Sequence, residues 1–202
     1  VTLGNHAWDH REIYEFIDTA PKLLRPSNFP NHAPGQGSTI VTINQFKVGV
    51  INIQARTFMN QMIDDPFPCL DQLITEISQE TPIIFVDIHG ETTSEKMAVA
   101  WYLDGRVSAV IGTHTHVQTN DARILAQGTA FLTDVGMTGA YDSILGMKKE
   151  AVIERFLTAR PQRFEVVEQG PVILSYCVID IDDKTGKAVR IHADTIIEDY
   201  GF

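Results

Sequence analysis

Histidine side chains gather at three short turns of this 202-residue sequence, and each turn also holds a glycine. The turns are Gly4-Asn5-His6, His89-Gly90-Glu91 and Gly112-Thr113-His114-Thr115-His116. Neutral imidazole is the commonest metal ligand in proteins, and an asparagine carbonyl is a hard oxygen donor. Glycine permits the tight turns that bring such groups close together. Taken together, the turns favour a metal site over the alternative that each histidine merely faces solvent.

The turns follow apolar runs that are typical of strands buried on both faces. Such runs cover residues 83–88 and 107–111, and Val1-Thr2-Leu3 resembles the end of a third. Ligands bind beyond the carboxyl ends of strands in α/β sheets, so we expect the histidine turns to meet at one edge. In an extended backbone, His114 and His116 would point to the same side.

The remaining elements complete a single α/β domain over residues 1–202. We expect a helix over 9–19 with Asp9 as its N-cap, a hairpin from 39–43 and 47–53, and helices near 70–77 and 94–104. A β-meander over 164–197 ends the chain. The apolar runs at 83–88 and 107–111 should share one sheet.

The amino-acid composition argues against several classes of function. The net charge of −10 and a pI near 5.0 disfavour binding of nucleic acid through bulk positive charge. A bound metal ion could still attract a small phosphate-containing substrate. Two cysteines, Cys69 and Cys177, make a disulfide scaffold a poor explanation, and we expect a cytoplasmic protein. No apolar run has the ~18–20 residues of a membrane helix.

Five ordered stretches carry a resemblance to a known family. They are Thr2-Leu3-Gly4-Asn5-His6-Ala7-Trp8-Asp9, Arg25-Pro26-Ser27-Asn28-Phe29-Pro30, Thr93-Ser94-Glu95-Lys96, Gly112-Thr113-His114-Thr115-His116-Val117-Gln118-Thr119 and Thr133-Asp134-Val135-Gly136-Met137-Thr138-Gly139. Together they resemble the YmdB family of bacterial calcineurin-like metallophosphoesterases, which are phosphodiesterases of 2′,3′-cyclic and related nucleotides. The resemblance covers nearly the whole chain. It implies an α/β fold, a two-sheet sandwich with helices on the outer faces.

The resemblance also implies a role for each clustered side chain. Asn5, His89 and His114 would bind one divalent ion, and His116 would bind a second, the ions being Fe, Mn, Zn or Mg. His6 would act on the phosphate as the catalytic residue rather than as a ligand. Family members carry an Asp, a Glu and an Asn upstream of Gly-Asn-His. Because the sequence opens at this motif, we expect one of the two metal sites to be incomplete, the first strands to be missing, and a face near Val1 to lie uncovered.

The expected function is metal-dependent hydrolysis of a small phosphodiester substrate. The expected substrates are 2′,3′-cyclic nucleotides and, as a second option, 3′,5′-cyclic nucleotides. A phosphatase or nuclease of the same superfamily, or a non-catalytic binding module, stays an alternative. Self-association into a homo-oligomer also stays open. Glu91 could accept a hydrogen bond from an imidazole or face water, and Trp8 could stack on a base or pack the first helix against the sheet. His10, His32 and His192 lie outside the clusters, and we expect them to face solvent.

Overall fold

The computed structural model describes residues 1–198, and its centre is a six-stranded sheet with the order β1-β2-β3-β4-β6-β5. Strands β2, β3, β4 and β6 run parallel, whereas β1 and β5 are antiparallel to their neighbours. The strands are β1 (Ser38–Ile43), β2 (Phe46–Gln54), β3 (Ile84–His89), β4 (Ala109–Thr113), β5 (Arg123–Ile124) and β6 (Ala130–Leu132). The prediction that the runs at 83–88 and 107–111 share one sheet is confirmed, because they form the neighbouring parallel strands β3 and β4.

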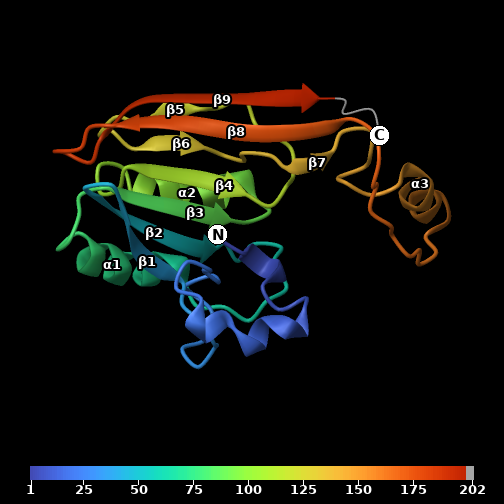
Figure 1. The fold of residues 1–202 in the computed structure, drawn as a ribbon, viewed down its shortest axis with the longest axis horizontal. Helices are drawn as coiled ribbons and strands as arrows, with labels where there is room; N and C mark the ends of the chain where they lie inside the picture. The colour runs from blue at the N-terminus through green and yellow to red at the C-terminus, as the bar shows by residue number, and fades with distance from the viewer. Residues whose placement is uncertain (199–202) are drawn as a thin grey trace.

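Alternate side chains of this sheet enter two different cores, as the period of two along a strand requires. One core contains Val86 and Val110 from the sheet together with Leu70 of α1 (Pro66–Ile77) and Val99 of α2 (Thr93–Tyr102). Helix α1 begins where Asp65 accepts a hydrogen bond from the Phe67 backbone at 3.0 Å. Both helices therefore cover the same outer face of the sheet (Figure 1).

The opposite face of the sheet packs against a second, three-stranded antiparallel sheet with the order β7-β8-β9. Its strands are β7 (Thr138–Ala140), β8 (Val172–Ile181) and β9 (Ala188–Glu198). Ile111 and Leu132 meet Ile179 and Ile191 in this second core. The two sheets thus form the expected sandwich.

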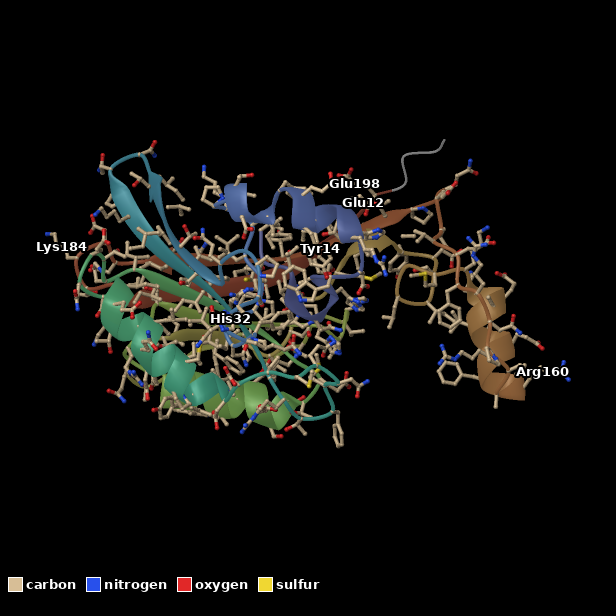
Figure 2. All side chains as sticks on the ribbon, turned by 90° about the horizontal axis from the view of Figure 1, so that it is seen from below. Glu12, Tyr14, His32, Arg160, Lys184 and Glu198 are labelled. Carbon is tan, nitrogen blue, oxygen red and sulfur yellow. The ribbon has the colours of Figure 1, made fainter. Side chains whose placement is uncertain are left out.

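Helices cover only one of the two outer faces, so the expectation of helices on both is wrong within residues 1–198. The outward positions of β8 and β9 include Asp180 and Arg190, which form an ion pair of 3.0 Å. The same face also exposes Leu174, Val178 and Ile196, so it is mixed in polarity, and no helix of the described residues covers it. Helix α3 (Lys149–Thr158), which ends just before Arg160, stands beside the sandwich rather than on it (Figure 2).

The amino-terminal segment does not form the helix expected over 9–19. It contains three short 3₁₀ helices, η1 (Gly4–His6), η2 (Arg11–Glu15) and η3 (Ile17–Thr19). The Asp9 carboxylate, the expected N-cap, contacts His6 Nδ1 at 2.7 Å instead of a backbone N–H. Without that cap, short 3₁₀ turns replace a continuous helix.

An apolar groove of about 550 Å³ lies where the second sheet stops short of β1 and β2. Val41, Val50 and Phe85 line one side, Ile179 lines the other, and Thr2 also lies on its wall. This agrees with the expectation of an uncovered face near Val1. Across residues 1–198, no helix is long and apolar enough to cross a membrane.

Candidate metal centre

Three predicted ligands meet at the carboxyl edge of the parallel strands. His89 is the last residue of β3 and pairs in register with Thr113, the last residue of β4, so His114 follows directly beside it. Asn5 arrives from η1, after Gly4, whose φ of +65° is a left-handed conformation that favours glycine. A Cβ at Gly4 would overlap the His89 imidazole, so glycine is required for this close approach.

Donor atoms of these three side chains converge on one point. His89 Nε2 lies 2.6 Å from Asn5 Oδ1 and 3.1 Å from His114 Nδ1. Bonds of ~2.1 Å from one ion to two nitrogens place those nitrogens about 3.0–3.4 Å apart at octahedral to tetrahedral angles. The two histidine nitrogens match that separation. The sequence prediction places Asn5, His89, His114 and His116 together, and the structure brings the first three of them together.

The partners on the far side of each imidazole decide which nitrogen carries its proton. Thr113 Oγ1 donates to Asp87 Oδ1 at 2.8 Å, so it accepts from His89 Nδ1 at 3.0 Å. His114 Nε2 lies 3.1 Å from Glu91 Oε2 and donates to it. In these tautomers, each ring would direct an unprotonated nitrogen toward the other and toward the Asn5 oxygen, whereas the 2.6 Å contact of His89 Nε2 with Asn5 Oδ1 is a hydrogen bond in the other tautomer of His89. Three acceptors that face one another repel unless a cation lies between them or the Asn5 amide rotates, so the donor set fits a metal ion.

Burial keeps both imidazoles neutral. Desolvation, followed by the charges of His114 and His6, lowers the pKa of His89 to about 3 from an ordinary value of 6.5. Burial likewise lowers the pKa of His114. Desolvation raises the pKa of Asp87, although the hydroxyl groups of Thr2 and Thr113 oppose this effect. Near pH 7 the two histidines thus present lone pairs without first losing a proton.

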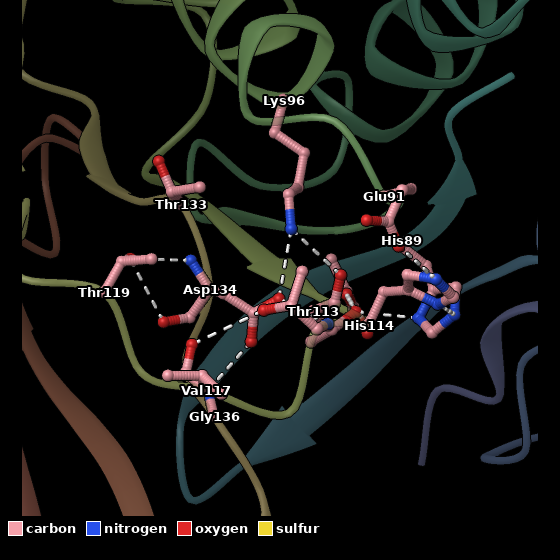
Figure 3. A network of polar contacts seen from close by, with 12 residues as sticks. His89, Glu91, Lys96, Thr113, His114, Val117, Thr119, Thr133, Asp134 and Gly136 are labelled. Atoms are coloured by element: carbon pink, nitrogen blue, oxygen red, sulfur yellow. Dashed lines mark hydrogen bonds and ion pairs between the residues drawn. The ribbon is translucent and has the colours of Figure 1, made fainter. Parts of the chain in front are cut away.

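The turn after β4 is strained, and a buried ion pair holds it. His114 has a φ of 115° and His116 a φ of 65°, both in the left-handed region that non-glycine residues seldom adopt. Asp134 Oδ2 accepts from the Thr115 backbone at 2.9 Å, and Lys96 Nζ donates to the Thr113 carbonyl at 3.2 Å (Figure 3). The expectation of an extended backbone at His114-Thr115-His116 is wrong for this reason.

Two further predicted site residues lie outside the three converging side chains, and His6, expected beside the ligands rather than among them, is near enough for its charge to act on His89. His6 is 65% exposed and contacts Asp9, and His116 is exposed at the end of its strained turn. Within residues 1–198, no three side chains among His, Cys, Asp and Glu are grouped so as to hold a metal ion. The converging set consists of two histidines and an amide, and a metal role for it and for His116 stays a prediction.

The sequence reasoning missed the residues that orient the site. Asp87 and Thr113 fix the His89 ring, and Lys96 and Asp134 fix the turn. One signal was present, since Asp87 is the single acid in an otherwise apolar strand, a position that a charged residue seldom takes without a partner. Glu91 is the acceptor of an imidazole N–H, which settles one of the two alternatives stated for it.

A small cleft opens from the convergence point. It has a volume of about 200 Å³ and is lined by Asn5, His114 and residues 58–61. The site therefore lies at the surface, within reach of a small molecule.

Comparison with known proteins identifies the family. The YmdB-like protein family matches residues 1–193. The chain is 56% identical over all its 202 residues to the 2′,3′-cyclic-nucleotide 2′-phosphodiesterase of Bacillus subtilis (strain 168), of which it covers 76%.

Two solved structures agree with this assignment. A protein from Thermus thermophilus superposes with a TM-score of 0.90 at 43% identity, covering 98% of this chain and 76% of the other. A phosphatase from Mycoplasma pneumoniae superposes with a TM-score of 0.88 at 34% identity, covering 98% and 72%. The Bacillus subtilis and Mycoplasma pneumoniae relatives are named as enzymes that hydrolyse phosphate esters. The chain belongs to the YmdB-like protein family.

Proposed function

We propose that this protein is a metal-dependent phosphodiesterase that hydrolyses 2′,3′-cyclic nucleotides. The observation that carries the proposal is the convergence of three side-chain atoms that can bind a metal ion, Asn5 Oδ1, His89 Nε2 and His114 Nδ1, at a surface cleft. The name of the 56% identical Bacillus subtilis relative supports the choice of substrate.

Asn5, His89 and His114 would hold one divalent ion, and His116 would contribute to a second together with acids outside residues 1–202. Divalent ions bound to such a site lower the pKa of water and neutralise charge on the phosphate oxygens. The ions would be Fe, Mn, Zn or Mg, since the four proposed ligands offer nitrogen and oxygen rather than sulfur.

The protein's own side chains would then orient and transfer protons. Asp9 accepts from His6 Nδ1–H at 2.7 Å and would stabilise the imidazolium form of His6, in which Nε2 also carries a proton that it could give to the departing oxygen. Because His6 is 65% exposed, it is accessible to a substrate phosphate without any movement of the core. Glu91 and Thr113 hold the two ligand rings in the tautomers that metal binding needs.

Hydrolysis of adenosine 2′,3′-cyclic phosphate in the presence of Mn²⁺ tests the proposal. We expect a nucleoside monophosphate as product, loss of activity with a chelator, and a large fall in kcat for His6→Ala with bound metal retained. The expected ligands upstream of Gly4 require that residues 1–202 be assayed beside a longer chain that includes them. We expect the longer chain to be active and residues 1–202 to bind at most one ion and be nearly inactive.

Three results would contradict the proposal. Hydrolysis that persists after complete removal of metal would rule out the metal-dependent mechanism. Full activity of residues 1–202 alone would show that the ligands are misassigned. Preference for p-nitrophenyl phosphate over the cyclic diester would favour a phosphatase, the activity named for the Mycoplasma pneumoniae relative.

A further inference from the structure

An aromatic pocket of about 390 Å³ lies beside the candidate metal centre, and the proposed chemistry does not use it. Its lining includes Trp8, Tyr14, Phe29, His32, Gln61 and Met62. We refer to this feature as the aromatic pocket. Tyr14 and His32 come from the amino-terminal part of the chain and lie near the middle of the molecule in Figure 2, whereas α3 stands at one end.

Three rings of the pocket pack on one another. The Trp8 and Tyr14 rings stack with centroids 5.3 Å apart, and the Trp8 and Phe29 rings lie 5.9 Å apart at a tilt of 50°. Phe29 is buried, whereas Tyr14 is 50% exposed. The cluster is thus anchored on its inner side and open on its outer side.

The aromatic pocket and the cleft at the metal centre share one lining residue. Gln61 lines both the aromatic pocket and the cleft that contains Asn5 and His114. Its Nε2 donates to the Asn5 backbone carbonyl at 3.5 Å, and its Oε1 accepts from Gln54 Nε2 at 3.0 Å. Trp8 is also only three residues from Asn5. A nucleotide with its phosphate at Asn5 and His114 would have to pass Gln61 to place its base on the rings.

The chemistry of the lining selects the part of the ligand that fits. The walls are aromatic and apolar, and among residues 1–198 no carboxylate, lysine or arginine lines them. A flat, neutral heterocycle gains stacking energy on such walls, while the Gln61 amide and His32 imidazole can hydrogen-bond to its edge. We propose that the aromatic pocket binds the nucleobase of the substrate, and this rests on the proposed function.

Fluorescence of Trp8 reports occupancy of the pocket directly and needs neither metal nor turnover. In a Trp101→Phe background Trp8 is the only tryptophan, and Trp101 is 54% exposed on α2. Adenosine 3′-monophosphate and adenosine should both quench it. Tyr14→Ala should weaken adenosine binding by about 5- to 100-fold, the range expected for one stacking contact. Phe156→Ala removes an 84% exposed ring on α3 and should leave binding unaltered.

A second variant tests the aromatic pocket independently of whether Tyr14→Ala folds correctly. Met62 is 90% exposed, so Met62→Asp places a carboxylate at the pocket without disturbing the core, and it should also weaken adenosine binding. Wild-type affinity for adenosine in both variants would overturn the proposal. Equal competition by an aliphatic alcohol such as hexanol would also overturn it, because the pocket would then be a general apolar site.

Kinetics separate this proposal from the proposed function. The longer chain with metal is given adenosine 2′,3′-cyclic phosphate and methyl riboside 2′,3′-cyclic phosphate, which lacks a base. Wild-type enzyme should prefer the nucleotide through a lower KM, and Tyr14→Ala should bring the ratio of kcat/KM values toward one. If wild-type enzyme hydrolyses neither compound, the proposed function fails. If it hydrolyses both equally well, only the nucleobase subsite fails.

Discussion

Lys96 Nζ and Asp134 Oδ2 lie 3.0 Å apart, and both side chains are completely removed from solvent. The pair joins α2 to the segment after β6, and both members also hold backbone groups on either side of His114. Asp134 Oδ1 additionally accepts from the Gly136 backbone at 2.9 Å. Each charge thus has several partners, as a buried ion requires.

Lys96→Met should destabilise the protein by about 3–5 kcal/mol, because it leaves the Asp134 carboxylate buried without its counter-charge. Urea denaturation measures the change in the free energy of unfolding. Lys148→Met is the matched control, since Lys148 forms a 2.7 Å pair with Glu165 while 53% exposed, and it should change the free energy of unfolding far less than Lys96→Met does. Equal effects of the two substitutions would contradict the structural role of the buried pair.

Gly4→Ala should reduce metal affinity sharply, because the added Cβ overlaps the His89 ring and moves Asn5. Gly146→Ala is the control, since Gly146 has a similarly positive φ of +88° and no atom of the described residues lies within 4 Å of its Cβ position. Gly146→Ala thus introduces backbone strain without touching a ligand. Calorimetric titration with Mn²⁺ should show weaker binding by Gly4→Ala than by Gly146→Ala, and equal affinities of the two variants would show that Asn5 is not a ligand.

Thr113→Val should lower metal affinity by about 10- to 100-fold, the usual cost of losing a partner behind a ligating histidine. The substitution removes the hydroxyl between Asp87 and His89 while keeping the side-chain shape. Thr113→Ser retains that hydroxyl and should restore most of the affinity. The hydroxyl has no orienting function if valine and serine bind Mn²⁺ alike.

Stability of the metal-free protein should fall as the pH decreases from about 6.5 toward 3. The pKa of His89 is lowered to about 3, so between these values the unfolded chain binds a proton that the native state does not. One such proton contributes a slope of about 1.4 kcal/mol per pH unit. His89→Gln should reduce the slope between pH 6.5 and 5, where most carboxylates do not titrate. His192→Gln removes an exposed histidine and should leave the slope as it is in the wild type. Equal slopes in the wild type, His89→Gln and His192→Gln would refute the conclusion that His89 is buried in its neutral form.

The sheet could be predicted from the sequence because its evidence is local. Mostly apolar runs rich in β-branched residues at 83–88 and 107–111 favour buried parallel strands. Since His89 and Thr113 end neighbouring strands in register, the meeting of His89 with His114 follows from the topology.

The strained turn and the first segment could not be predicted, because distant contacts decide them. The left-handed backbone of His114 and His116 depends on Asp134, which comes 18 or more positions later. In the first segment, the partner of Asp9 is His6 rather than a backbone N–H, and no residue pattern distinguishes these outcomes. Propensity is a weak prior where tertiary contacts compete with it.

The contact between Asn5 and His89 spans 84 positions of sequence, and the turn that completes the cluster is held by Asp134. A nascent chain therefore lacks the three-donor arrangement until β6 and the residues after it have left the ribosome. At ~5–20 residues per second, synthesis from Asn5 to Asp134 takes roughly 6–26 seconds. Under the proposed metal role, loading of the ion would follow the synthesis of these residues, because shorter emerging fragments lack the assembled cluster.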